Sequence, residues 1–118
     1  MLLFKRKYTL TMPRSEIKVT VIKRVDPQYI FDGNVPEAPN GEKYTKCNVF
    51  REGQEFIFKT DNTRPEGFCP WAFENICRDV SILMFGGDFY PWTRIGTQIT
   101  CCNDGIRPVV FQLERIEE

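Results

Sequence analysis

The most informative absence in this chain of 118 residues is histidine, which does not occur at all. A chain without histidine excludes Ser–His and Cys–His nucleophile pairs and every metal site that needs an imidazole ligand. Net charge is also absent, because 16 basic residues balance 16 acidic ones. A neutral protein lacks the overall positive field that favours nucleic acid or anionic lipid. We therefore expect neither nucleic acid nor a membrane among its partners.

The chain also lacks a long apolar run, and none approaches the roughly 20 residues that a membrane-spanning helix needs. Its beginning, MLLFKRKYTLTM, is too short and too charged in its middle for a secretory signal. These absences predict a cytoplasmic protein. In a reducing compartment its five cysteines, an odd number, are expected to be thiols or metal ligands and not a disulfide framework.

Length and composition predict a single domain over residues 1–118, because hydrophobic residues make up 42% of the chain and suffice for a core. Residues 1–15 look like an N-terminal extension whose apolar side chains suit an edge strand: Phe4, Tyr8 and Leu10. Residues 26–46 are rich in proline, glycine and aspartate and are predicted to be a long loop. Loops of this length are often functional, and the alternative is a tolerated insertion.

One strong helix is predicted from about residue 70 to about residue 85. Pro70 suits the first helical position, which makes Cys69 the N-cap residue, and Gly86 and Gly87 supply the end. The apolar stripe that should face the core consists of Ala72, Ile76, Val80 and Leu83, widened by Phe73, Cys77 and Met84. The side chains expected mainly on the opposite side are Glu74, Asn75, Arg78 and Asp79.

Alternating apolar and polar residues predict strands on both sides of this helix in the sequence. Residues 17–24 and a strand near residues 54–60 precede it, and residues 97–102 and 108–116 follow it as a hairpin around an Asn-Asp-Gly turn. The inward side chains should be Ile17, Val19, Val21, Phe56, Phe58, Val109, Phe111 and Leu113. This order predicts an α+β fold, in which one main helix packs on a small antiparallel β-sheet or open barrel.

Three segments, GFCPWA, GGDFYPW and CCNDGIRPVVFQLERI, resemble the motifs of a family of small bacterial and archaeal proteins of uncharacterised function. Members of that family show PEGFCxWA, GGxFPW and CCxDGxRPVxFxIERI. The resemblance covers residues 18–116, and this chain departs from the pattern in the inserted Tyr90, the 26–46 loop and the N-terminal extension. The resemblance implies no established activity.

Cys69 is the candidate catalytic residue. At a helix N-cap its sulfur would lie near free backbone N–H groups and the positive end of the helix dipole, and Arg64 in the preceding loop can add positive charge. Such surroundings favour a thiolate, which suits a nucleophile, a redox thiol or a metal ligand. The alternative is a buried, inert cysteine that acts as a small apolar residue.

The remaining cysteines can be separate thiols, a disulfide or ligands of a metal site. Adjacent strand residues point to opposite faces, so Cys101 and Cys102 are expected to be one surface thiol and one core thiol, unless the nearby turn brings one toward Cys69. A strained vicinal disulfide is a third arrangement. The candidate ligands of a four-thiolate zinc site, or less favourably an iron–sulfur cluster, are Cys47, Cys69, Cys101 and Cys102. No C-x-x-C signature supports such a site, and Cys77 is predicted to be a core residue.

Aromatic residues at the helix start and in the loop of residues 87–92 can line a pocket for a small molecule or peptide. The alternative is a hydrophobic plug that closes the end of a small barrel. The candidate ligand-binding residues are Trp71, Asp88, Trp92 and Arg107. Asp104 either borders the pocket as well or is a turn residue that pairs with Arg107.

Three functions follow from these candidates, and the sequence does not decide whether the protein is an enzyme. The first is a small module, accessory for instance to a redox enzyme, that binds a ligand, metal or partner protein through the cysteine and aromatic residues. The second is a thiol or redox enzyme in which Cys69 is the nucleophile and Cys101 or Cys102 resolves the intermediate. The third is a structural domain that forms homo-oligomers through an exposed strand edge.

Overall fold

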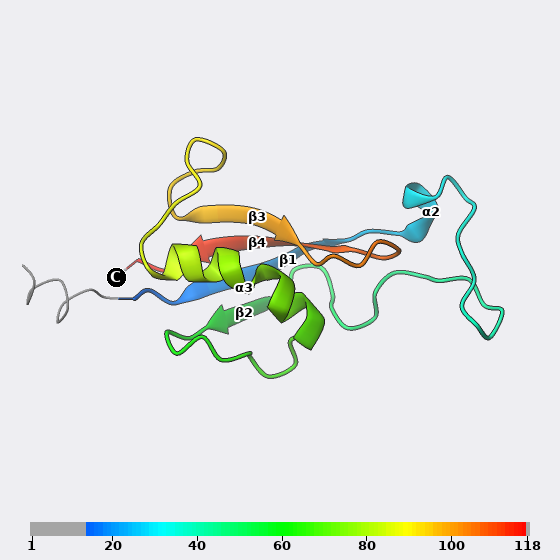
Figure 1. Ribbon diagram of the computed structural model, residues 1–118, viewed down its shortest axis with the longest axis horizontal. Coiled ribbons are helices and arrows are strands. Elements are labelled where there is room, and N and C mark those ends of the chain that lie inside the picture. Colours follow the sequence, from blue (N-terminus) through cyan, green and yellow to red (C-terminus); the bar gives the residue numbers. More distant parts are fainter. Residues whose placement is uncertain (1–13, 118) are drawn as a thin grey trace, which may run out of the picture.

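A computed structural model describes residues 14–117, in which one helix covers one face of a four-stranded antiparallel sheet (Figure 1). The elements in chain order are β1 (Ile17–Arg24), α2 (Pro27–Ile30), β2 (Glu55–Phe58), α3 (Pro70–Met84), β3 (Thr97–Cys101) and β4 (Val109–Arg115). The strand order across the sheet is β2-β1-β4-β3, and the sheet does not close into a barrel. The predicted α+β fold is confirmed in its open-sheet form. The edge strand predicted through Phe4, Tyr8 and Leu10 lies outside the described residues.

The inward side chains of the sheet are those that strand alternation predicts. β1 and β4 lie at the centre and pair with Val19 opposite Leu113 and Val21 opposite Phe111. All four side chains are buried, as are Phe56 and Phe58 on β2. A fully buried apolar side chain contributes roughly 1.5–3 kcal/mol to stability. The strands therefore supply half of a continuous core, and α3 covers it.

The main helix begins at Pro70 with Cys69 as its N-cap residue, as predicted, and ends at Met84. Phe85 is the C-cap residue, and Gly86 follows at a φ of 92°, a left-handed conformation in which a side chain would be strained. The apolar stripe faces the sheet and is buried: Ala72, Ile76, Val80, Leu83 and Met84.

Two helix residues differ from their predicted surroundings. Asp79 is only 8% exposed instead of lying on the solvent side, because it faces β3, where Gln98 Nε2 lies 3.5 Å from its Oδ2. The same Gln98 side chain accepts a 3.0 Å hydrogen bond from the backbone N–H of Ile99 on the outer edge of the sheet. Cys77 is half-buried and does not belong to the core cluster, and its sulfur accepts a hydrogen bond from Asn62 Nδ2 at 3.3 Å.

Two phenylalanines from irregular segments complete the core. Phe50 and Phe68 are 2% and 1% exposed, and their ring centroids lie 5.0 Å apart. Both rings also contact Phe111 on β4, at 5.3 Å and 5.5 Å between centroids. These contacts hold the segments that precede β2 and α3 against the sheet.

The predicted long loop of residues 26–46 has some structure of its own and extends away from the sheet (Figure 1). It contains the four-residue helix α2, whose N-cap Asp26 accepts a hydrogen bond from Gln28 N, and a bridge between Glu37 and Lys43. The short helix was not predicted, because four residues are too few to show a helical period. No helix in residues 14–117 is long and apolar enough to cross a membrane.

Candidate functional site

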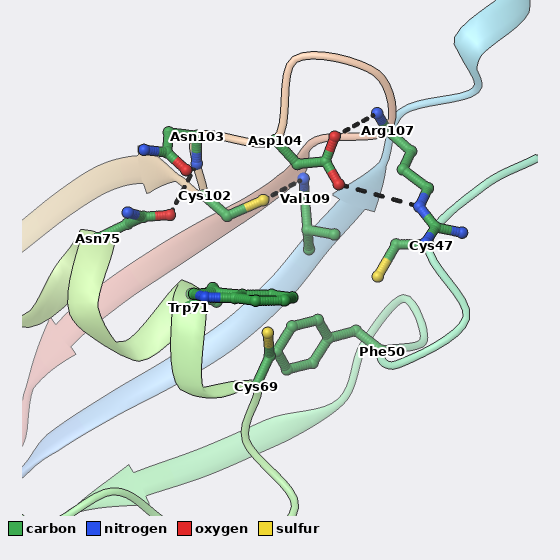
Figure 2. Close-up of a pocket in the computed structure, with 11 residues that line it drawn as sticks. Cys47, Phe50, Cys69, Trp71, Asn75, Cys102, Asn103, Asp104, Arg107 and Val109 are labelled. Atoms are coloured by element: carbon green, nitrogen blue, oxygen red, sulfur yellow. Dashed lines mark hydrogen bonds and ion pairs between the residues drawn. The ribbon is translucent and has the colours of Figure 1, made fainter. Parts of the chain in front are cut away.

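A pocket of about 220 Å³ opens at the N-terminal end of α3, where three segments that are distant in the sequence meet (Figure 2). One wall comes from the chain before β2, the second from the start of α3, and the third from the β3–β4 connection. The lining residues are Cys47, Phe50, Cys69, Trp71, Ala72, Asn75, Cys102, Asn103, Asp104, Arg107 and Val109. Most of the lining surface is apolar, as in sites that bind small molecules.

Arginine side chains hold the first two walls in place. Arg24 on β1 donates to the backbone oxygen of Cys47 at 3.1 Å and to Glu52 Oε1 at 2.9 Å. Arg64 donates to the backbone oxygen of Phe68 at 2.7 Å, immediately before Cys69. The guanidinium of Arg64 thus orders the entry into α3, a positioning role that no pattern in the sequence indicates.

The third wall is tied to the helix and closed on itself. Asn75 on α3 accepts a 2.8 Å hydrogen bond at its Oδ1 from the backbone N–H of Asn103. Cys102 N donates to Val109 O at 3.1 Å, and Val109 N donates to the sulfur of Cys102 at 3.3 Å. These bonds keep the β3–β4 connection beside the first turns of α3, so the pocket has walls on both sides.

Three of the five cysteines line this pocket, and all five are free. Cys47, Cys69 and Cys102 are half-buried and pack against the core. Cys69 is the N-cap residue, but its side chain makes no capping hydrogen bond to the helix. Cys101 ends β3 and is exposed, so the adjacent pair consists of one surface thiol and one pocket thiol.

The predicted metal site has no support in this geometry. In the part of the chain that the structure describes, no group of three or more cysteine, aspartate or glutamate side chains is arranged to hold a metal ion. Cys101 lines no part of the pocket that the other three thiols share. A zinc or iron–sulfur site built from Cys47, Cys69, Cys101 and Cys102 thus remains a hypothesis drawn from residue types alone.

Asp104 and Arg107 are the charged residues of the pocket. Asp104 Oδ1 accepts hydrogen bonds from the backbone N–H groups of Ile106 and Arg107 at 2.9 and 3.1 Å, and its Oδ2 lies 3.9 Å from Arg107 Nε. The guanidinium of Arg107 lies 5.5 Å from the centre of the Tyr44 ring, within the range of a cation–π contact. Both readings of Asp104 therefore hold, since it forms the turn and also borders the pocket.

The predicted ligand-binding set divides between the two ends of α3. Trp71 and Arg107 line the pocket, whereas Asp88 and Trp92 belong to the loop that follows the C-terminal end of the helix (Figure 1). A 15-residue helix separates the two places by about 22 Å. The predicted rim of Trp71 and Trp92 is not formed, and Trp92 is 87% exposed.

Asp88 has a structural role instead of a place in the pocket. Its Oδ1 accepts a 2.6 Å hydrogen bond from Gly96 N and lies 3.0 Å from Arg115 Nη2 on β4. The Gly96 N–H, followed by the Arg115 guanidinium, holds the pKa of Asp88 below its usual value. Asp88 therefore fastens the base of its loop to the last strand.

Five lining residues were not among the predicted site residues: Phe50, Ala72, Asn75, Asn103 and Val109. Ala72 was predicted only as part of the buried stripe of the helix. Val109 was predicted to be an inward strand residue, and Asn103 a turn residue, so their neighbourhood was recognised but their place in a pocket was not. Phe50 lies in a segment without periodicity and carries no local signal. Asn75 was assigned to solvent because a helical pattern shows no partner that lies beside its polar face.

The chain matches no family model, no curated protein and no solved structure. Its resemblance to a family of small bacterial and archaeal proteins therefore stays a prediction. Two of the segments that carry the resemblance, residues 67–72 and 101–116, supply most of the pocket lining.

Proposed function

We propose that this protein is a small ligand-binding module whose pocket at the N-terminal end of α3 takes a small, largely apolar molecule. The observation that carries this proposal is the convergence of three thiols, Trp71 and the buried Phe50 from three segments on one pocket. A concave, mostly apolar site with few polar groups is the usual form of a small-molecule site. The proposal places the protein in the cytoplasm, where a reducing environment keeps cysteines as thiols.

The size and the depth of the pocket limit what it can hold. A volume of about 220 Å³ is smaller than the roughly 300–1,000 Å³ of sites for drug-sized ligands. Trp71 is 79% exposed although it lines the pocket, so its indole stands at the mouth, within reach of a ligand. A ligand of about one ring fits such a site better than a peptide or a nucleotide.

A thiol enzyme has less support from the same geometry. Without histidine, a general base for Cys69 would have to be a carboxylate, lysine or water. Asp104 is the one carboxylate among the lining residues, and two backbone N–H groups already bind its Oδ1. That oxygen is therefore engaged in closing the turn and does not face Cys69 as a free acceptor. Binding is therefore the function that these residues serve best.

The test uses benzyl alcohol as a neutral, one-ring probe and iodoacetamide as a thiol reagent, with alkylation of each cysteine followed by mass spectrometry. We expect benzyl alcohol to slow alkylation of Cys69 and Cys102, which line the pocket, and to leave the exposed Cys101 unchanged. Equal rates with and without the probe at all cysteines contradict the proposal.

The two tryptophans provide a matched pair of variants for the same test. Trp71→Ala removes a pocket wall and should weaken the binding of benzyl alcohol severalfold, whereas Trp92→Ala should leave it unchanged. The affinity is measured from the backbone amide shifts of Ala72 and Asn103 in an NMR titration. A larger loss for Trp92→Ala than for Trp71→Ala would move the site to the other end of the helix.

A further inference from the structure

The pocket presents a single positive group that the fold itself leaves largely unengaged. Among residues 14–117, the Arg107 guanidinium has one charged neighbour, Asp104 Oδ2, and the 3.9 Å from Nε to that oxygen exceeds a hydrogen bond. Its other contact is the Tyr44 ring, which holds the guanidinium in place without using its N–H donors. Figure 2 shows the side chain extending from the β3–β4 connection toward Cys47. The donors of Arg107 are therefore available to a ligand.

One oxygen of the only carboxylate that lines the pocket is already in use. Asp104 Oδ1 accepts two backbone hydrogen bonds that close the turn, at 2.9 and 3.1 Å. The other lining residues are cysteines, asparagines and apolar side chains. An anionic ligand thus meets the available donors of Arg107. A cationic ligand meets the repulsion of Arg107 and a carboxylate of which one oxygen, Oδ1, is held by the turn and the other, Oδ2, lies 3.9 Å from the same guanidinium.

Partial burial of Arg107 strengthens its attraction for an anionic ligand. The Arg107 side chain is 33% exposed, so water screens it less than it screens a fully exposed arginine. A guanidinium binds carboxylates through two parallel hydrogen bonds, which fix the ligand's orientation as well as its charge. Beside it, Trp71, Val109 and Phe50 offer flat and apolar surfaces to the remainder of a ligand.

We propose that the pocket selects small aromatic carboxylates, with the carboxylate on the Arg107 guanidinium and the ring on the apolar wall beside Trp71. This inference rests on the proposed binding function and names its ligand class. The cavity has room for about one ring with a short acidic substituent, because its 220 Å³ lies below the usual range for larger ligands.

The experiment compares three probes that share one ring and differ in charge: benzoate, benzyl alcohol and benzylamine. Each is titrated into the full chain at neutral pH and constant ionic strength, and the amide shifts of Ala72 and Asn103 are followed by NMR, with Ile95 as a remote reference. We expect benzoate to bind roughly tenfold more tightly than benzyl alcohol, because a charge-assisted hydrogen bond is stronger than a neutral one. Benzylamine should bind most weakly.

Two substitutions of opposite sign test the role of Arg107. Arg107→Gln should abolish the preference for benzoate, whereas Arg78→Gln, the same change at an 85% exposed helix position outside the pocket, should preserve it. Asp104→Asn keeps an oxygen for the turn but removes the negative charge near Arg107, so it should strengthen benzoate binding severalfold. The Asp104→Asn variant therefore tests the role of the Arg107 charge even where Arg107→Gln disturbs the fold.

The outcomes separate the ligand class from the binding function. Equal affinities for benzoate and benzyl alcohol, or a preference for benzylamine, overturn the inference and leave a pocket that binds uncharged or cationic ligands. Weaker benzoate binding by Asp104→Asn also overturns it. If none of the three probes shifts the pocket amides, both the inference and the proposed function fail.

Discussion

The two ends of α3 carry similar residues but differ in surroundings. Each end has a tryptophan and, in a loop beside it, an acidic residue. Trp71, in the first turn of the helix, lines a pocket, whereas Trp92 is 87% exposed on a projecting loop (Figure 1). At the first end, the segment before β2 and the β3–β4 connection both reach the helix. At the other end, Asp88 and Arg115 fasten only the base of the loop. A binding site therefore depends on the walls that neighbouring segments supply, and not on aromatic content.

The largest expected effect comes from removing the wall that both the core and the pocket share. Phe50→Ala deletes a 2% exposed ring in contact with Phe56, Phe68 and Phe111, and should lower the free energy of unfolding by about 3–5 kcal/mol. Trp92→Ala, at the other end of the helix, should change it by less than about 0.5 kcal/mol. Urea unfolding followed by circular dichroism measures both. Similar losses of unfolding free energy in the two variants would contradict the view that only the pocket end of the helix is packed into the core.

A smaller effect tests the hydrogen bond that ties the third wall to the helix. Asn75→Ala removes the acceptor of the Asn103 N–H and should speed hydrogen exchange at that amide roughly two- to tenfold, equivalent to about 0.5–1.5 kcal/mol. Asn75→Asp keeps an acceptor oxygen and should restore slow exchange. Glu74→Ala, at the neighbouring exposed position, is the control. Unchanged exchange in Asn75→Ala would mean that the wall is held by the core alone.

The smallest effect is a dependence of stability on acid. The backbone N–H of Arg24 and the Arg24 guanidinium lower the pKa of Glu52 from 4.5 to about 2. Because the pKa is lower in the folded state, this group contributes stability that is fully present above pH 4.5 and is lost as the pH falls toward 2. The contribution is small, since the carboxylate is exposed to solvent.

The measurement is the free energy of unfolding between pH 5 and pH 2, for the wild type and for Glu52→Gln. We expect a shallower decline in the variant, since its side chain cannot take up a proton. Amide shifts near Cys47, whose carbonyl Arg24 also binds, should change in the same range at the pocket end. A decline of equal slope in both proteins would assign the acid sensitivity to other carboxylates, such as Asp88 at the opposite end.

The regular elements could be predicted because burial repeats along them. A period of two along the strands predicted that Val19, Phe111 and every second residue beside them face the core. A period near four along the helix predicted that Ile76 and Leu83 pack against the sheet. Phe50 and Phe68 are equally buried, but their segments have no period, so nothing local marks them as core residues. The buried Asp79 was missed for the related reason that a helical pattern does not show a neighbouring edge strand.

The candidate site could be predicted in its components but not in its assembly. Cys69, Trp71, Cys102 and Arg107 were identified from residue type and position, and they line one pocket. Asp88 and Trp92 were grouped with them because of their aromatic surroundings in the sequence. Proximity along the chain does not show that a 15-residue helix keeps the two groups apart. The pairing of Asn75 with Asn103 depends on tertiary packing, which no local pattern encodes.

The side chain of Gln98 affects how the free edge of the sheet can pair with strands of other molecules. β3 is an edge strand, and an unpaired edge can template the addition of strands from other molecules. Here Gln98 Oε1 binds the outward N–H of Ile99, and Thr93 Oγ1 donates to the carbonyl of Thr97 at 2.8 Å. An incoming strand has to displace these local bonds before it can form its own. These bonds thus oppose the addition of an intermolecular strand at the part of the edge that carries the exposed Ile99.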